Sequence, residues 1–249
     1  MKQGFLLPVY RHGKTACSLA KRLAASGLPV ILVDDGNDAE TQILLAECAA
    51  ETPGVVLERL EKNTGEGGAF IKGLERAEKL GLTHVLQIDA DGQHDAERAP
   101  FFLEESAQHP DMIICGYPEF DKTAPKSRVT GRKISNFWAA VVTLSTELKD
   151  VLCGFRVYPV DETLRITNNP FLDQRMGFDA EIMVRLYWNR VYPLFHPIKV
   201  RYPEDGVSNF RVVRDNIRIS WMFTRLCIGM LIRLPFLVFR RKLKRGMSF

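Results

Sequence analysis

Two carboxylates that flank a single alanine are the residues of this chain best suited to chemistry. They lie in the sequence Asp-Ala-Asp-Gly-Gln-His at 89–94, directly after the apolar run 84–88. Such a run is typical of a buried strand, and open α/β sheets bind ligands at the carboxyl ends of their strands. Two ionised carboxylates this close repel each other, and a hard divalent cation relieves the repulsion. We therefore expect Asp89, Asp91 and the amide oxygen of Gln93 to bind Mg²⁺ together with substrate phosphate oxygens.

Two further motifs are suited to binding the nucleotide part of a phosphate-bearing substrate. Asp-Asp-Gly at 34–36 ends an expected strand, where a carboxylate can accept hydrogen bonds from a base or a ribose hydroxyl. The same motif is equally typical of a plain turn. Between the acidic sites lies Asn-Thr-Gly-Glu-Gly-Gly-Ala at 63–69. Its backbone N–H groups, those of Gly65 and Gly67 included, open an expected helix and are suited to receive a base or a phosphate.

The glycine spacing excludes other nucleotide-binding classes. A G-x-G-x-x-G fingerprint counted from Gly65 needs a third glycine where Phe70 stands, and no G-x-x-x-x-G-K-[ST] sequence occurs. A dinucleotide-binding fold and a P-loop are therefore excluded. A sugar-nucleotide pyrophosphorylase would carry a G-x-G-T-R-type loop after its first strand, and residues 11–13 do not match it.

Apolar strand-like runs alternate with helix-period segments, which predicts βαβ units and a mostly parallel sheet flanked by helices. The expected strands are 5–10, 30–33, 55–60, 84–88, 112–115, 154–158 and 194–201. The expected helices are 15–26, 39–50, 68–80, 96–108, 128–145 and 179–189. Residues 118–126 are expected to be a polar loop. We expect one catalytic domain at 1–210 and a separate tail at 211–249.

The charge is distributed unevenly along the 249 residues. Residues 211–249 carry ten Lys or Arg and one acid, whereas residues 1–210 carry a net charge of −5. This distribution does not suit a duplex-DNA binder, and we expect no nucleic-acid partner. It suits an enzyme held against an anionic membrane surface. Five widely spaced cysteines and an N-terminus without a secretory pattern favour a cytoplasmic body.

The tail pattern favours a helix lying in the membrane interface over one that spans the bilayer. Arg218, Arg225 and Arg233 interrupt the apolar stretch 216–239, and each arginine at the centre of a spanning helix costs about 2.5–3.5 kcal/mol. Pro235 is expected to kink or end the helix. The side chains expected to enter the lipid are Trp221, Phe223, Leu226, Met230 and Leu234, and the basic anchor is Arg240, Arg241, Lys242, Lys244 and Arg245. The alternative is a helix packed on its own domain or on a second copy of the chain.

Six motifs occur in a characteristic order: Pro-Val-Tyr at 8–10, the motifs at 34–36, 63–69 and 89–94, Cys-Gly-Phe-Arg at 153–156 and Gly-Phe-Asp-Ala-Glu at 177–181. With them the chain resembles the family 2 glycosyltransferases, and within these the dolichyl-phosphate mannose synthase-like, polyprenyl-phosphate sugar transferase branch. The resemblance covers roughly residues 4–210. It implies a glycosyltransferase A fold, a UDP- or GDP-sugar donor, Mg²⁺ or Mn²⁺, and inverting transfer to a membrane lipid.

The resemblance also implies roles for individual residues. Those around the nucleotide would be Pro8, Tyr10, Asp34 and Asp35, with Asp89 contacting the ribose or the metal. Arg156 and Glu181 would shape the donor-sugar site. The acceptor phosphate would be held by Arg132, Lys133, Ser135, Arg201 and Ser208. The closing loop usually reads R-x-x-G-x-S-K, whereas residues 201–209 are two residues longer and lack the lysine. Much of the branch has C-terminal membrane helices, and we expect the tail at 211–249 to take their place in this chain.

The acceptor decides whether a catalytic base is needed. A lipid phosphate is already anionic, whereas a hydroxyl of a lipid-linked sugar or glycolipid needs a carboxylate base. Asp179 and Glu181 are both available, and they share a face on a strand but not on a helix. We favour a polyprenyl phosphate, with the hydroxyl acceptor as the alternative and an inactive membrane-bound nucleotide-binding scaffold as a second one. The enzyme is expected on the cytoplasmic face of the inner membrane.

Overall fold

A single seven-stranded sheet organises the chain, with the strand order β3-β2-β1-β4-β6-β5-β7. The computed structural model describes residues 1–120, 126–200 and 211–246, without the side chains of 120, 126–128 and 240–246. The strands are β1 (Gln3–Val9), β2 (Val30–Asp35), β3 (Val55–Leu60), β4 (His84–Gln87), β5 (Ile113–Phe120), β6 (Arg156–Pro159) and β7 (Pro193–Val200). The helices are α1 (Gly13–Ala24), α2 (Ala39–Glu51), α3 (Glu66–Lys79), the 3₁₀ turn η1 (Ala96–Arg98), α4 (Ala99–Gln108), α5 (Lys126–Thr143), α6 (Val160–Thr167), α7 (Phe178–Trp188) and α8 (Val212–Gly246).

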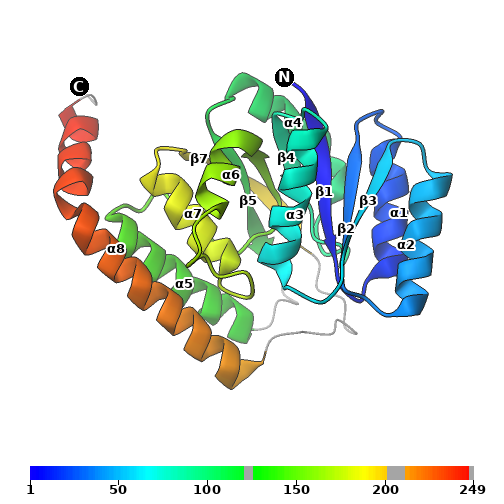
Figure 1. Cartoon of the computed structure of the whole chain (residues 1–249). Coiled ribbons are helices and arrows are strands. Elements are labelled where there is room, and N and C mark those ends of the chain that lie inside the picture. Colours follow the sequence, from blue (N-terminus) through cyan, green and yellow to red (C-terminus); the bar gives the residue numbers. More distant parts are fainter. Residues whose placement is uncertain (121–125, 201–210, 247–249) are drawn as a thin grey trace.

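The sheet is mostly parallel, as the sequence predicts, and helices cover both of its faces (Figure 1). Only β6 runs antiparallel to its neighbours β4 and β5. In the parallel part, Val9 pairs with Asp34 and Leu6 pairs with Gln87. This register brings the carboxyl ends of β1, β2 and β4 to one edge of the sheet, where the polar motifs follow each strand.

Two parts of the fold differ from the sequence-based expectation. Helix α6 was not expected, because its eight residues are too few for a clear apolar period. Strand β5 continues through Pro118 to Phe120, where a polar loop was expected, and pairs with β7. Its pairing with β6 involves only Ile114 and Cys115. Pro118 therefore lies beyond that ladder on the β6 side, where a missing N–H costs no hydrogen bond.

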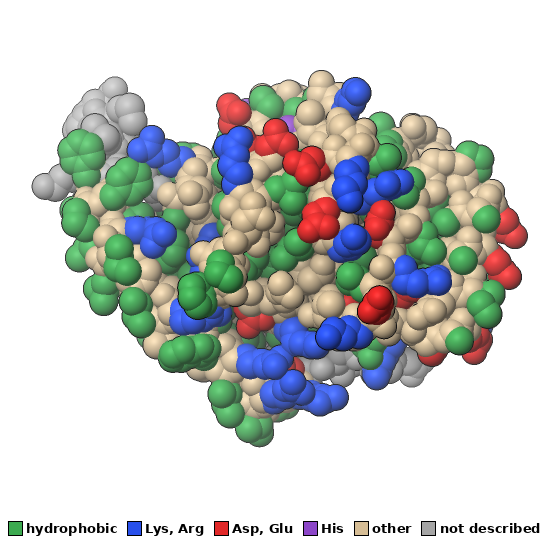
Figure 2. All heavy atoms as spheres, in the orientation of Figure 1, with side chains coloured by type: hydrophobic (Ala, Val, Ile, Leu, Met, Phe, Trp, Pro, Cys, Tyr) green, Lys and Arg blue, Asp and Glu red, His purple; other side chains and the backbone are tan. Residues whose placement is uncertain are grey.

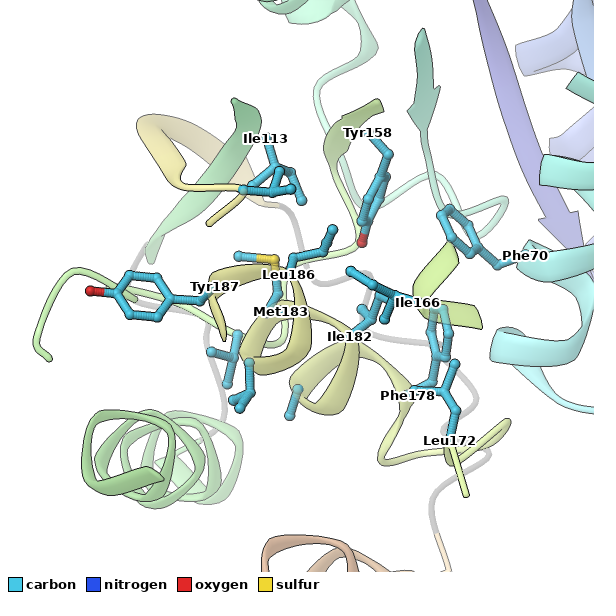
Figure 3. Close-up of a cluster of buried hydrophobic side chains, with 14 of the residues drawn as sticks. Phe70, Ile113, Tyr158, Ile166, Leu172, Phe178, Ile182, Met183, Leu186 and Tyr187 are labelled. Carbon is cyan, nitrogen blue, oxygen red and sulfur yellow. The ribbon is translucent and has the colours of Figure 1, made fainter. Parts of the chain in front are cut away.

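Two apolar clusters pack on opposite faces of the sheet. On one face, the ring of Phe70 lies 4.7 Å from that of Tyr158 and 5.3 Å from that of Phe178, which joins α3 to α7 (Figure 3). On the other face, the ring of Phe102 lies 4.9 Å from that of Phe155. These two clusters hold β4 and β6 from both faces of the sheet. Asp89 lies just after the end of β4, and Arg156 begins β6.

Helix α8 packs alongside α5 and α7 and crosses the lower left of the molecule (Figure 1). Its inner face buries Met222, Phe223, Leu226 and Leu237. The expectation that Phe223 and Leu226 enter lipid is therefore wrong, because both side chains face the protein body. The helix continues past Pro235, and its red C-terminal part runs in a different direction from the orange part. The proline thus accompanies a bend and does not end the helix.

Candidate active site

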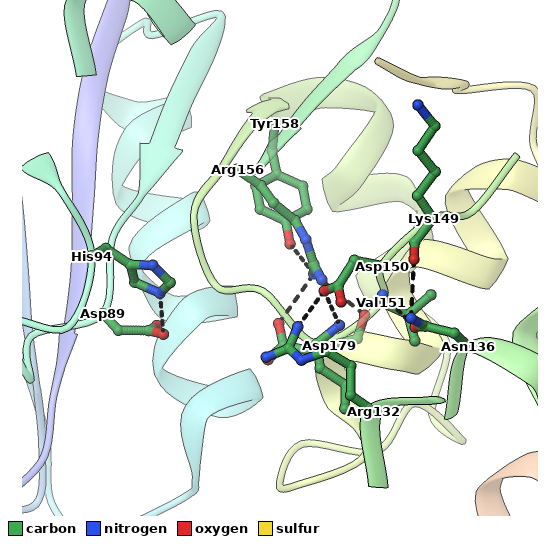
Figure 4. A network of polar contacts seen from close by, with 11 residues as sticks. Asp89, His94, Arg132, Asn136, Lys149, Asp150, Val151, Arg156, Tyr158 and Asp179 are labelled. Carbon is green, nitrogen blue, oxygen red and sulfur yellow. Dashed lines mark hydrogen bonds and ion pairs between the residues drawn. The ribbon is translucent and has the colours of Figure 1, made fainter. Parts of the chain in front are cut away.

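The carboxylate of Asp89 lies just beyond β4, at the edge of the sheet. His94 Nε2 is 3.1 Å from its Oδ2 atom (Figure 4). A Cβ atom added to Gly154 would lie 2.4 Å from both Asp89 carboxylate oxygens. Only glycine lets the chain before β6 approach the carboxylate this closely. The Cys-Gly-Phe-Arg motif therefore shapes the space around the first aspartate of the Asp-x-Asp motif.

Asp89 and Asp91 have pKa values shifted in opposite directions. Burial opposes the ionisation of Asp89, but the hydrogen bond with His94 and the nearby Arg156 outweigh it and lower the pKa of Asp89. Burial and the negative charge of Asp89 raise the pKa of Asp91. The backbone N–H of Gln93 donates to Asp91 Oδ1 at 2.9 Å, which partly opposes that rise. The pair thus carries like-charge repulsion that a cation would relieve.

Arg156 is completely buried at the start of β6. Its Nη1 atom donates to the Tyr158 hydroxyl at 3.1 Å and to Asp179 Oδ1 at 3.2 Å (Figure 4). Its Nε and Nη2 atoms have no hydrogen-bond partner among the residues that the structure describes. Buried donors without partners are costly, so this guanidinium is suited to receive further acceptor oxygens.

A second carboxyl pair, which the sequence analysis did not assign, lies beside this arginine. Glu66, at the start of α3, shares a side-chain hydrogen bond with Asp179 and accepts one from Gln87 Nε2 at 3.3 Å. Burial and the charges of Asp179 and Asp89 raise the pKa of Glu66 well above its ordinary value. Burial also raises the pKa of Asp179, although Arg156 opposes the rise. The sequence signal that could have pointed to Glu66 was Gln87, a polar residue inside a completely buried strand that needs a hydrogen-bond partner.

Asp179 and Glu181 both lie on α7, so they do not share a face. Glu181 is completely buried, and its Oε1 atom is 2.5 Å from Arg185 Nη2. Its Oε2 atom accepts from the Asp173 N–H at 2.9 Å and from Arg225 Nη2 at 3.3 Å. Glu181 therefore joins α7 to α8, whereas Asp179 faces Arg156. A role for Glu181 at the donor sugar stays a prediction.

Asp34 is completely buried in a network of internal hydrogen bonds. Its Oδ1 atom accepts from the N–H of Asn37 at 3.0 Å and from the Asn37 side chain at 2.8 Å, and its Oδ2 atom accepts from Arg59 Nε at 3.0 Å. Asn37 also donates to the Val9 carbonyl at 2.8 Å and thereby joins the ends of β1 and β2. Nucleotide binding by Asp34 stays a prediction, and a base would have to replace one of these donors.

Asp35 fixes the glycine-rich loop. It accepts from the N–H groups of Thr64 at 2.7 Å and Gly65 at 3.0 Å. The N–H groups of Gly67 and Gly68 donate to the Gln174 carbonyl at 3.0 and 3.3 Å. The backbone donors expected to receive a nucleotide thus have protein partners. Direct nucleotide contacts of Asp35, Gly65 and Gly67 stay predictions that require some of these bonds to be exchanged.

The two remaining residues predicted to contact the nucleotide lie at the carboxyl end of β1. Pro8 pairs with Val33 of β2 in the parallel register, and Tyr10 follows the strand, with the guanidinium carbon of Arg11 5.0 Å from its ring centre. His12, which follows this end of β1, is among the groups that oppose the rise in the pKa of Asp91 and so lies near the Asp-x-Asp motif. Contact of Pro8 and Tyr10 with a nucleotide base stays a prediction.

The residues predicted to hold the acceptor are only partly brought to the site. Arg132 Nη1 is 2.5 Å from Asp150 Oδ1, and its charge acts on Asp179 (Figure 4). Ser135 is buried one turn further along α5, while Lys133 is exposed. Arg201 and Ser208 lie outside the described residues. Their segment begins directly after the end of β7, where Val200 forms a bridge with His94.

A divalent cation fits the carboxylate pair. The described residues include no group of three or more His, Cys, Asp or Glu placed to hold a metal by themselves. Mg²⁺ does not need such a group, because it usually takes one or two carboxylates and completes its shell with water and substrate phosphates. After burial, the negative charge of Asp89 is the next cause of the raised pKa of Asp91, and a cation would relieve this part of the rise. Asp89 and Asp91, together with Gln93, match this donor chemistry.

Comparison with solved structures shows a similar fold. The chain matches the crystal structure of Staphylococcus aureus TarS 1-349 in complex with UDP-GlcNAc with a TM-score of 0.56. The match has 15% sequence identity and covers 91% of this chain and 66% of that chain, so this chain spans less than two thirds of the solved segment. This likeness confirms a GT-A-like α/β fold.

Comparison with sequences shows the family. The family model for Glycosyl transferase family 2 matches residues 6–195, and the chain belongs to that family of glycosyltransferases. An undecaprenyl-phosphate mannosyltransferase of Micrococcus luteus is 30% identical over 195 residues, covering 72% of this chain and 75% of that protein. A polyprenol monophosphomannose synthase of Mycolicibacterium smegmatis is 24% identical and covers 86% and 82%. The resemblance to the polyprenyl-phosphate sugar transferase branch is confirmed.

Proposed function

We propose that this glycosyltransferase transfers a sugar, with inversion, from a UDP- or GDP-sugar to a polyprenyl phosphate at a membrane surface. The observation that carries the proposal is that Asp91, Arg156 and Asp179 all act electrostatically on Asp89 at the carboxyl end of β4. The adjacent helices α5 and α8 carry exposed apolar side chains. The relatives named as acting on undecaprenyl or polyprenol phosphate support the acceptor.

The main barrier to such a reaction is charge. Negative charge gathers on the departing nucleoside diphosphate while the anomeric carbon becomes cationic. A divalent cation held by Asp89, Asp91 and Gln93 supplies electrostatic stabilisation of the leaving diphosphate when it is bound. The lowered pKa of Asp89 keeps its carboxylate ionised at neutral pH, and Gly154 keeps it in place.

The buried arginine gives the site a fixed positive charge on the protein side. Arg156 is held by Tyr158 and Asp179 through its Nη1 atom, which leaves the N–H groups of Nε and Nη2 for oxygens of the donor sugar or its phosphates. Asp179 orients this guanidinium, and Glu66 in turn holds Asp179. Because the group is dry and already oriented, it needs little reorganisation during the reaction.

A polyprenyl phosphate needs no base, since its phosphate is anionic at neutral pH. Its oxygen forms a bond to the anomeric carbon as the bond to the nucleoside diphosphate breaks, and this single displacement inverts the configuration. Arg132 contributes positive charge beside Asp179 on the inner side of α5. We assign it, with Ser135, to the acceptor phosphate.

Asp179 also supports a second candidate, transfer to a hydroxyl of a lipid-linked sugar or glycolipid. Its pKa is raised by burial, and a carboxylate with a raised pKa is better suited to accept a proton from a hydroxyl. A single variant distinguishes transfer to a hydroxyl from transfer to a phosphate. Asp179→Asn abolishes hydroxyl transfer, whereas transfer to a phosphate retains part of its rate.

The exposed apolar face is assigned to the membrane. We define the outer stripe by eight of the exposed apolar side chains of α8, which are Val213, Ile217, Trp221, Ile228, Leu231, Ile232, Val238 and Phe239. Ile134, Phe137 and Trp138 of the adjacent α5 are also exposed. Large exposed apolar patches of this kind mark surfaces that bind a protein partner or a membrane.

Helix α8 suits a membrane surface better than a span. Residues Val212–Phe239 are long and apolar enough to cross a bilayer by length and composition alone, and most of this stretch is not buried. However, the inner side of α8 is packed on α5 and α7, and Arg225 and Arg233 turn towards Glu181 and Trp188 of the body. The outer stripe therefore faces away from the body without these charges. We place the enzyme as a peripheral protein on the cytoplasmic face of the inner membrane.

The proposal is tested by supplying a panel of UDP- and GDP-sugars with undecaprenyl phosphate in vesicles, with Mg²⁺ or Mn²⁺ or with a chelator. We expect a lipid-linked sugar from one donor, formed only with metal. Formation of no product with any donor, phosphate or lipid hydroxyl contradicts an enzymatic function and favours the scaffold. Product formed at full rate in the chelator contradicts the metal assignment alone.

A further inference from the structure

We propose that a basic groove at the start of α8 binds the phosphate headgroup of an anionic phospholipid and anchors this end of the molecule to the bilayer. The groove has a volume of about 630 Å³, and its lining includes Lys62, Asp173, Arg175, Arg218 and Trp221. The proposal rests on the proposed membrane attachment. It adds a specific lipid site, distant in sequence from the basic run at 240–245.

Three segments form the groove. Lys62 lies in the connection between β3 and α3, Arg175 in the connection between α6 and α7, and Arg218 with Trp221 in α8. Arg175 fastens the first two segments, because its Nη1 and Nη2 atoms donate to Asn63 Oδ1 and to the Asn63 carbonyl at 3.0 and 3.1 Å. Arg225 fastens the third segment through the Phe171 carbonyl. The walls are therefore fixed by the protein itself.

Positive charge in the groove is only partly compensated. Neither Lys62 nor Arg218 has an ion-pair partner among the residues that the structure describes. The one carboxylate named in the lining, Asp173, already accepts the Arg175 backbone N–H at 2.7 Å through its Oδ1 atom. A phosphate oxygen placed between the two free cations would gain charge-assisted hydrogen bonds. The groove thus complements an anion of phosphate chemistry.

The apolar surroundings favour a lipid as the source of that phosphate. Trp221 is 61% exposed, lines the groove and belongs to the outer stripe of α8. Tryptophan beside basic side chains is typical of the headgroup level of a membrane. Figure 2 shows Lys and Arg side chains gathered at the lower centre of the molecule, next to hydrophobic side chains of α8. A soluble phosphate would make no use of this apolar neighbour.

Headgroup binding here would set the orientation of the enzyme. The groove lies at the beginning of α8, and the basic residues at 240–245 lie at its end. The outer stripe is therefore bracketed by positive charge at both ends, which favours a helix lying flat on an anionic leaflet. Lys62 is also one residue before Asn63, whose side chain donates to Asp35 at 2.8 Å. The lipid would thus bind beside the same strand ends that carry the active site.

The test measures binding of the full chain to phosphatidylcholine vesicles with and without phosphatidylglycerol. The variant is Lys62→Gln with Arg218→Gln, and the matched control is Lys21→Gln with Lys79→Gln, which removes two exposed charges at the opposite edge of the sheet. We expect the groove variant to lose about tenfold in affinity for the vesicles containing phosphatidylglycerol. We expect little change for the control, and none for either variant on phosphatidylcholine alone.

Each other outcome is also informative. An equal loss in both variants overturns the proposal, because it shows long-range attraction without a site. A loss confined to phosphatidylcholine vesicles that carry undecaprenyl phosphate overturns it as well, because the groove would then serve the acceptor. The binding measurement uses no donor. A wild-type chain that binds phosphatidylglycerol through the groove but forms no product in detergent contradicts the proposed function alone.

A second measurement locates the lipid. Brominated phosphatidylglycerol quenches tryptophan fluorescence at short range, so we expect it to quench the wild-type chain more than Trp221→Phe. Lys62→Gln combined with Arg218→Gln, compared with the wild type at the same amount of vesicle-bound protein, should lower the part of the quenching that Trp221→Phe removes. Equal quenching in all three proteins would place the headgroup elsewhere and overturn the proposal.

Discussion

The site around Asp89 and the outer stripe of α8 are built in opposite ways. We call this site, which is formed by Asp89, Asp91, Arg156, Asp179 and Glu66, the Asp89 corner. In the corner, Arg156, Asp179 and Glu66 hold one another inside the protein, and Nε and Nη2 of the buried Arg156 have no partner among the described residues. Along α8, large apolar side chains such as Ile232, which is 75% exposed, lie on the surface. The first region is preorganised for a small charged ligand. The second is completed only by an apolar surface outside the molecule.

The two regions meet on α5, and this meeting indicates how they cooperate. Arg132 faces Asp150 and the catalytic corner, while Phe137 and Trp138 face outwards beside α8. The Trp138 ring lies 6.5 Å from that of Phe223, which joins the two helices. A single helix thus separates the charged site from the apolar face. An acceptor with an apolar chain and a phosphate head fits this arrangement.

The largest effect is expected from a substitution in the Asp89 corner that leaves the outer stripe unchanged. Asp91→Asn should lower the turnover of the lipid-linked product by at least about 10²-fold, since it removes one electrostatic element of the site. Membrane binding and unfolding temperature should stay near those of the wild type. Asp111→Asn, an exposed carboxylate elsewhere, is the control. A near-normal rate in Asp91→Asn would refute the metal assignment.

The next largest effect is expected from substitutions in the outer stripe that leave the Asp89 corner unchanged. Ile228→Ser combined with Ile232→Ser should weaken vesicle binding by roughly tenfold or more, because two apolar side chains no longer enter lipid. Turnover in detergent should remain. Leu226→Ala, on the buried inner face, should instead lower the free energy of unfolding by about 2–5 kcal/mol. If the three substitutions gave the same profile in binding and unfolding, the inner and outer faces of α8 would be wrongly assigned.

A smaller effect is expected from the close packing within the corner. Gly154→Ala places a methyl group where the Asp89 carboxylate lies, so the carboxylate must move. We expect kcat to fall on the order of tenfold, since small misplacements of reacting groups are costly. The matched substitution Gly131→Ala, where an added Cβ meets nothing within 4 Å, should leave the rate unchanged. Equal rates for both variants would show that Asp89 tolerates displacement.

The smallest effect concerns pH and folding stability. Because the pKa values of Glu66 and Asp179 are raised on folding, the native state holds more protons than the unfolded state between the ordinary and the raised values. Stability is therefore gained as pH falls through this window and lost as pH rises through it. Glu66→Gln mimics the protonated group and should flatten this dependence. Urea unfolding at acidic and neutral pH measures it, and an unchanged slope would contradict the pairing.

The fold was largely predictable, because buried parallel strands are short apolar runs and the motifs mark their ends. The seven strands were located in order, since their apolar runs stand between helical periods. The extension of β5 past Pro118 was not predictable, because it depends on pairing with β7, which follows more than seventy residues later. Which face of α8 is buried was also not predictable. Phe223 and Ile232 are equally apolar in sequence, and only packing on α5 separates them.

The site was predictable where a motif carries its own chemistry. Asp89 and Asp91 could be selected as candidates from their spacing after a strand, and Asp179 could be selected together with Glu181 as a candidate base. Glu66 was missed because its partners, Gln87 and Asp179, lie on two other elements of the fold. The hydrogen bonds that Asp35 forms with the glycine loop likewise join segments thirty residues apart. Contacts between distant segments leave no local pattern in the sequence.

The most direct test of the central claim is a crystal of the full chain soaked with Mn²⁺ and UDP or GDP. The anomalous signal of manganese should give one peak in contact with the carboxylates of Asp89 and Asp91 and with both phosphates of the nucleotide. Asp91→Asn should lose that peak under the same conditions. A nucleotide bound elsewhere, or a corner without manganese in the presence of bound diphosphate, would contradict the assignment of this sheet edge to sugar transfer.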